Sequence, residues 1–171
     1  MTPSKKGFTV PLLKQGKVAD DTFVRIGDED PLPDQGDVIV GLSRWQADRD
    51  ELTRRKGSLG VELAVGESPS EIEGDLAHFD VIALDFPAFS DGRAFSSARL
   101  LRERHGFQGE IRAVGDVELE QLHFMARVGF DSFLIESDDP EKDWTTAQAD
   151  LDLWYQPTED GHTTVRQKRR R

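Results

Sequence analysis

The chain has 171 residues, of which 36% are hydrophobic and 32% are charged, and its formal net charge is −11 at pH 7. This length fits one domain, and the negative charge argues against nucleic acid as the main partner, because phosphate contacts require a basic surface. The absence of cysteine excludes a thiolate nucleophile, a disulfide and a cysteine-ligated iron–sulfur cluster within the chain.

Further function classes are disfavoured by missing motifs. No apolar run approaches the roughly 20 residues of a membrane span, and the N-terminus lacks the apolar segment of a secretory signal, so we expect a cytoplasmic protein that does not act at a membrane. The four histidines do not show the spacing of a zinc site, so no metal is predicted. The phosphate-binding glycine motifs and the GxSxG elbow are also missing, and no cofactor is predicted.

The chain divides by composition into three parts. Residues 1–36 are predicted to be an irregular N-terminal segment in which Phe8–Val10 and Thr22–Ile26 alternate weakly, as short edge strands do. Residues 37–156 are predicted to form an α/β domain. Residues 157–171 end in VRQKRRR and are expected to be a disordered basic tail, with an electrostatic hook for an acidic partner as the alternative.

The α/β prediction rests on five short apolar runs that alternate with helical segments. Parallel neighbouring strands need a crossover, and a helix supplies it, so this order predicts βαβ units with about five parallel strands. An open doubly wound sheet and a half-barrel both fit. The predicted strands are residues 37–42, 59–65, 81–86, 110–115 and 131–136, and the predicted helices are residues 43–57 with Ser43 as N-cap, a short one from 69 or 70, 92–105, 117–129 with Gly129 at its end, and 140–155.

Polar residues collect where these strands end. Loops at the carboxyl ends of parallel strands carry the ligand sites of such folds, so residues there and the polar residues of neighbouring segments are candidates for binding. The candidate ligand-binding residues are Asp85, Asp91, Gly92, Arg93, Arg112, Asp116 and Gln121.

Two arginines carry the chemical hypothesis. Arg93 lies in the first turn of a predicted helix, where a cation opposes the helix dipole, so it needs a carboxylate such as Asp85 or an anionic ligand. Arg112 interrupts the fourth apolar run, and a buried guanidinium must be paired or reach a wet cleft. Its expected partner is Asp85, Asp116 or Asp131, or else an anion. We expect the two guanidinium groups to gather on one rim of the fold.

Several candidates also have a purely structural interpretation. Asp91 can cap the helix that starts near Gly92, because its carboxylate can accept the free N–H groups of the first turn. Gln121 falls within an apolar arc, where an amide is more often a tether for a loop than a ligand contact. Arg99 and Glu103 are four residues apart and are expected to pair on a solvated face.

One resemblance adds to these patterns. The segments GDVIVGLSRW, LGVEL, ALDFPAFSDGRAFSSARLLRERHGFQGEIRAVGDV and QLHFMARVGFDSF resemble a bacterial family of unknown function. Its members are often labelled as oxidoreductases involved in sulfite reduction, and their genes commonly lie beside those of assimilatory sulfite reductase. The resemblance covers residues 20–156 and implies a role in sulfur assimilation. No catalytic residue is established for the family, so none is carried over.

The resemblance and the composition together leave two hypotheses open. Sulfite reductase uses an iron–sulfur cluster and sirohaem held by cysteines, so a chain without cysteine is not the reductase itself. The first hypothesis is an accessory protein without its own redox centre, whose partner is sulfite reductase or another sulfur-assimilation protein. The alternative is a protein or enzyme that binds a small anion, such as sulfite, sulfate or a carboxylated tetrapyrrole, in an Asp/Arg cleft. A flavin or nicotinamide enzyme has the least support, and whether the chain is an enzyme stays open.

Overall fold

A strongly curled sheet of eight strands forms the frame of the protein, as seen in a computed structural model that describes residues 10–149. The strand order is β2-β1-β8-β7-β6-β5-β4-β3, with β3 to β8 parallel and β1 and β2 antiparallel. The half-barrel alternative is therefore confirmed. The strands are β1 (Leu12–Lys14), β2 (Lys17–Ala19), β3 (Phe23–Ile26), β4 (Asp37–Gly41), β5 (Leu59–Leu63), β6 (Val81–Phe86), β7 (Glu110–Gly115) and β8 (Ser132–Leu134).

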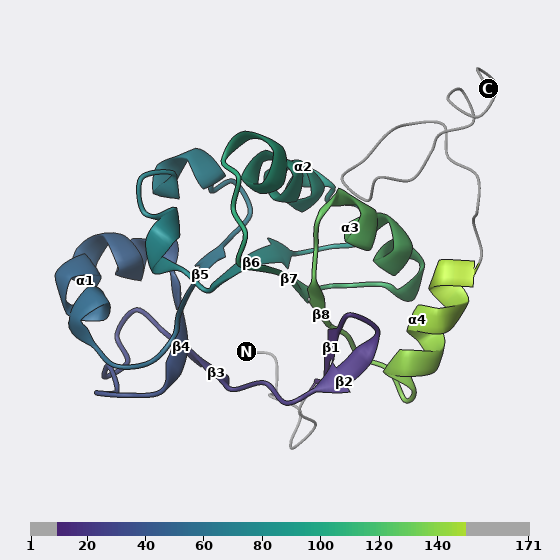
Figure 1. Ribbon diagram of the computed structural model, residues 1–171, viewed down its shortest axis with the longest axis horizontal. Coiled ribbons are helices and arrows are strands. Elements are labelled where there is room, and N and C mark those ends of the chain that lie inside the picture. The colour runs from purple at the N-terminus through teal and green to yellow at the C-terminus, as the bar shows by residue number, and fades with distance from the viewer. Residues whose placement is uncertain (1–9, 150–171) are drawn as a thin grey trace.

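The helices lie outside the arc of strands, where they cover the convex face (Figure 1). The predicted helix over 92–105 is α2, continued by a π-helical turn, and that over 117–129 is a 3-10 turn followed by α3. Helix α3 ends at Gly129 in the left-handed conformation, as predicted. The bounds are α1 (Leu42–Arg54), η1 (Pro69–Ile72), η2 (Leu76–His78), α2 (Arg93–Arg99), η3 (Leu100–Arg104), η4 (Leu119–Gln121), α3 (Leu122–Val128) and α4 (Pro140–Ala149).

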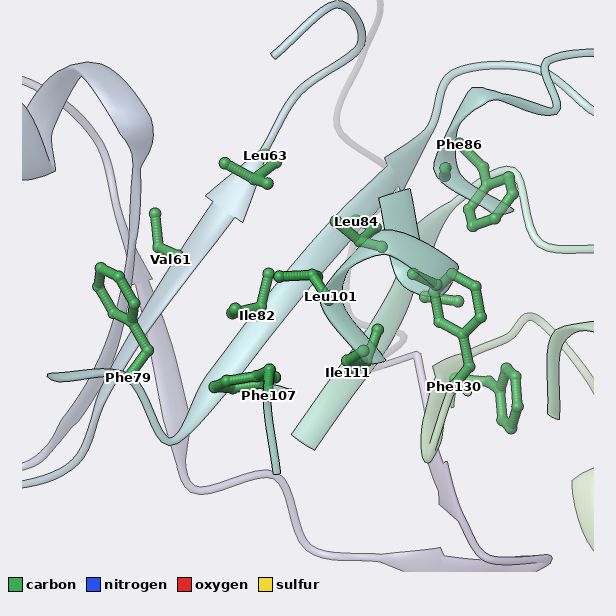
Figure 2. Packing of buried hydrophobic residues seen from close by; sticks show 14 of the residues in the cluster. Val61, Leu63, Phe79, Ile82, Leu84, Phe86, Leu101, Phe107, Ile111 and Phe130 are labelled. Carbon is green, nitrogen blue, oxygen red and sulfur yellow. The ribbon is translucent and has the colours of Figure 1, made fainter. Parts of the chain in front are cut away.

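The main core lies between the sheet and these helices. Successive residues of a strand face opposite sides, so Ile82 and Leu84 of β6 point to the helices while Ala83 points to the concave side. Figure 2 shows Leu101 of η3 lying against Ile82, Leu84 and Ile111. Because the helix-facing residues of every parallel strand from β4 to β8 are apolar, this layer fixes the sheet against the helices.

Two local predictions differ from the structure. Ser43 does not cap α1; Gly41 is the N-cap, and the Ser43 hydroxyl donates to Asp28 instead. The hairpin β1–β2 was not expected within the irregular N-terminal segment. Its turn uses Gln15 and Gly16, both at positive φ, and this two-residue turn between LLK and KVA is the signal that could have identified it. Phe8 and Thr9, the basic tail and the expected helix beyond Ala149 lie outside the described residues.

A short strap crosses the open side of the half-barrel. Strands β2 and β3 are at opposite edges of the sheet, yet only Asp20, Asp21 and Thr22 separate them in sequence. Four Cα steps span at most about 14 Å. The end of β2 and the start of β3 must therefore lie close together, although they belong to opposite edges of the sheet. The strap runs along the open side of the arc, between β2 and β3 (Figure 1). The strap therefore crosses the open side of the concave face, from the carboxyl-end level of β8 to the start of β3.

Candidate functional site

A cavity of about 490 Å³ occupies the concave face of the half-barrel. The apolar part of its lining comes from inward-facing residues of four strands and the start of β3: Phe23, Ile39, Ala83, Val114 and Leu134. Asp21 and Arg112 line it at the strap, and Asp116, Glu118 and Glu136 line it in the loops that follow β7 and β8. The cavity thus extends from the strap to the carboxyl ends of the strands, the end where parallel sheets bind ligands.

The floor of the cavity is a buried ion cluster around Arg112, which is 2% exposed. Its Nη1 donates to both carboxylate oxygens of Asp21, at 2.9 and 3.0 Å, and its Nε donates to Oε1 of Glu110 at 2.9 Å. The guanidinium also lies over the ring of Phe23, 5.4 Å from its centre. The expectation that Arg112 is paired is correct, but the expected partners Asp85, Asp116 and Asp131 are wrong.

Glu110 is the second member of this floor and is fully engaged. Besides Arg112 it accepts hydrogen bonds from Nζ of Lys14 and from the hydroxyl of Ser132, each at 2.6 Å. Burial disfavours its charge, but these donors and the Arg112 cation outweigh burial, so the pKa of Glu110 lies below its ordinary value. The floor is therefore a charged and hydrogen-bonded structural unit.

A second ion pair lies in the same row of the concave face as Arg112. Glu62 of β5 is 7% exposed, and Arg25 of β3 donates to its carboxylate. Burial raises the pKa of Glu62, and the nearby carboxylates Asp85 and Glu67 raise it further, while Arg25 opposes them. Arg25 itself is 72% exposed in its side chain. A buried carboxyl with a raised pKa can exchange a proton with a bound molecule.

Arg93 lies apart from this cavity. Its guanidinium pairs with Asp91 at 2.5 Å, and its backbone N–H donates to the same carboxylate at 3.1 Å. These bonds from Arg93 hold the pKa of Asp91 at about 2. Arg93 and Asp85 line a small hollow between α2 and the ends of β5 and β6, next to Gly92. Its volume of about 20 Å³ is too small for a ligand. Asp91 therefore accepts one N–H of the first turn, that of Arg93, while the N-cap residue itself is Gly92, which has no side-chain cap.

Asp116 and Gln121 meet on the backbone of Phe89. The Asp116 carboxylate accepts the N–H of Phe89 at 2.9 Å, and the Gln121 amide donates to its carbonyl at 3.2 Å. Gln121 is therefore a loop tether, as its structural interpretation predicts. The Phe89 ring above this clamp is 50% exposed.

The structure thus does not bring the predicted residues into one site. Arg112 and Asp116 both line the concave cavity, whereas Asp85 and Arg93 line the other hollow, with Asp91 and Gly92 beside it. The expected common rim of Arg93 and Arg112 does not form, since each is locked in its own ion pair.

Sequence reasoning missed four residues of the concave face: Asp21, Arg25, Glu62 and Glu110. One signal was available, because Glu62 interrupts the apolar run LGVEL in the same way that Arg112 interrupts EIRAVG. A charge at an inner position of a covered strand is unusual. In register, both residues flank Ala83 of β6, so the two interruptions mark one row across the concave face.

The residues described contain no cluster of three histidine, aspartate or glutamate side chains arranged to hold a metal ion. No helix between residues 10 and 149 is long and apolar enough to cross a membrane.

Comparison with known proteins gives one result. Neither the curated proteins nor the solved structures contain a match to this chain. A family model does match, over residues 60–166, and this is more than half of the chain. The matched region contains β5 to β8 and the helices between them, and so includes Glu62, Ala83 and Arg112 of the concave face. The chain therefore belongs to DUF934, a family described as a bacterial protein of unknown function.

Proposed function

We propose that this protein binds a small polar molecule in the concave cavity of the half-barrel. Ligand sites are typically clefts of about 300–1,000 Å³, and the cavity of about 490 Å³ has this size and combines apolar with charged lining residues. The observation that carries the proposal is the placement of the buried Glu62 in such a cavity. Burying a carboxylate costs free energy because the group loses its contacts with water, and a bound ligand offsets this cost.

The proposal is tested with two valine variants of equal chemistry. Val114→Phe places a ring in the cavity, whereas Val24→Phe places one on the outer side of β3, where the side chain is 58% exposed. Thermal unfolding is measured with sulfite, sulfate, a carboxylated tetrapyrrole and agmatine as probes. At least one probe should stabilise the wild type and Val24→Phe, but not Val114→Phe. The proposal is contradicted if the probes stabilise both variants equally, or if they stabilise none of the three proteins.

A second candidate function is an accessory role in assimilatory sulfite reduction through a protein partner. The family resemblance suggests it, and the chain lacks the cysteines of a redox centre. Phe89 is the observation that favours partner binding, because its backbone is held by Asp116 and Gln121 while its ring is half exposed. A backbone that is fixed before binding loses little entropy on association, and exposed aromatic residues often dominate interfaces.

Growth of a deletion strain tests this second function. Without the gene, growth on sulfate should be impaired and growth on cysteine normal. Complementation with Phe89→Ala should fail, whereas Leu100→Ala, another exposed apolar position, should restore growth. Co-purification with sulfite reductase should be lost in the Phe89 variant. Normal growth of the deletion strain on sulfate together with no co-purification would refute the accessory role.

A further inference from the structure

We propose that the ligand of the concave cavity carries a positively charged nitrogen, an amine or a guanidinium, which binds Glu62 in place of Arg25. This inference rests on the ligand-binding function proposed above and names its ligand class. It replaces the anion expected from the sequence with a cation.

The charge of the cavity favours a cationic ligand. Five carboxylates line it, from Asp21, Glu62, Asp116, Glu118 and Glu136, against the two guanidinium groups of Arg25 and Arg112. Arg112 is already neutralised by Asp21 and by Glu110 beneath it. A cleft in which one sign of charge prevails concentrates the field of that sign and attracts the opposite charge.

The floor and Glu62 differ in how many hydrogen-bond partners they have. Glu110 accepts bonds from three different side chains, and Arg112 is bound by two carboxylates, so the floor has no need of a ligand. Glu62 is about equally buried, yet among the described residues Arg25 alone donates to it. Buried carboxylates normally collect several donors, so Glu62 has capacity left for a bound molecule.

A ligand cation can replace Arg25 at Glu62. Its side chain is 72% exposed and comes from β3, the edge strand of the sheet, so its guanidinium can return to water without loss of packing. Water screens the exposed guanidinium, which weakens its attraction to Glu62. A ligand cation inside the cavity would meet Glu62 with less competing water and at a lower effective dielectric.

An anion fits the same cavity less well. Arg25 is the cation with donors to spare, but its partner Glu62 sits against it, and Asp116 and Glu136 also line the cavity. An anion bound to Arg25 would therefore face several like charges, and a like charge in close contact is unfavourable.

Calorimetric titration with agmatine, which carries both an amine and a guanidinium, and with sulfate as the anion probe tests the inference. Agmatine should bind the wild type, and sulfate should not. Arg25→Ala should bind agmatine several-fold more tightly, because the internal competitor is gone. Glu62→Gln should weaken binding by about tenfold or more. Glu51→Gln, the same change at an exposed position of α1, should bind like the wild type.

A cationic and an anionic ligand predict opposite effects of Arg25→Ala on binding. If sulfate binds and Arg25→Ala abolishes that binding, the cation preference is overturned while the cavity function stands. If agmatine does not bind, the cation preference is likewise overturned, and the two valine variants decide the cavity function separately. Circular dichroism of each variant confirms that it is folded, so a loss of binding is not a loss of structure.

Discussion

At the scale of single residues, Arg112 shows what a buried charge contributes to this fold. Its guanidinium joins the strap residue Asp21 to Glu110 of β7 and so ties the strap to the sheet. We expect Arg112→Met to lower the free energy of unfolding by about 3–5 kcal/mol, since it leaves two carboxylates without their cation. Urea denaturation measures this difference. Arg99→Met, which breaks the exposed pair with Glu103, should change it by less than about 1 kcal/mol, and equal effects would contradict the assignment.

Glu62 should make stability depend on pH. Its pKa is raised in the folded protein, mainly by burial, so the folded state holds this proton more tightly than the unfolded state. The stabilisation is complete below the unfolded pKa and is lost as pH rises through the folded pKa. Glu62→Gln removes this loss, so its stability relative to the wild type should increase as pH rises from about 4, near the unfolded pKa, toward neutrality. A difference in unfolding free energy that stays flat over this range would show that the Glu62 pKa is not raised.

Asp91 provides a test of a different kind, because its pKa is lowered. Its bonds with the Arg93 side chain and N–H hold the pKa at about 2, against an ordinary value of 3.8. Arg93→Ala should raise the Asp91 pKa toward that value, as measured by an NMR titration of its carboxyl carbon. Arg99→Ala leaves the pair intact and should leave the pKa unchanged. No rise in Arg93→Ala would mean that the pair does not form in solution.

At the scale of elements, the end of α3 depends on one glycine. Gly129 has φ of +114°, and a Cβ there would lie 2.6 Å from the Cγ of Arg102, whose guanidinium binds the Gly129 carbonyl. Gly129→Ala should therefore destabilise the protein by about 1–3 kcal/mol. Gly74→Ala is the matched control, because a Cβ at Gly74 meets nothing within 4 Å and its φ is not positive. Thermal unfolding of both variants decides this, and equal midpoints would contradict it.

The elements were predictable to the extent that burial alone defines them. The apolar runs 81–86 and 110–115 coincide with β6 and β7, because both strands are covered on both faces. The hairpin β1–β2 was missed, since its strands have three residues each and carry no regular alternation. The partner of Arg112 could not be found either. Asp21 is 91 residues away, and only the return of β3 to the far edge of the sheet brings the two together.

At the scale of the whole molecule, the curl of the sheet decides where a site can form. The sequence predicts polar residues at the carboxyl ends of the strands, but a doubly wound sheet would place helices on both faces. In the half-barrel the helices cover the convex face, and a cavity remains on the concave face (Figure 1). Curvature results from strand twist and from the strap, and neither is written in the pattern of apolar runs. For this reason residues expected on one rim, Arg93 and Arg112, belong to different hollows.

The central claim, that the concave cavity is the binding site, is tested most directly by amide chemical-shift mapping of isotope-labelled protein during a titration with agmatine. The largest changes should fall on the cavity-lining residues Glu62, Ala83, Val114 and Leu134. Saturable changes centred instead on Asp91 and Arg93 at the start of α2 would contradict the claim.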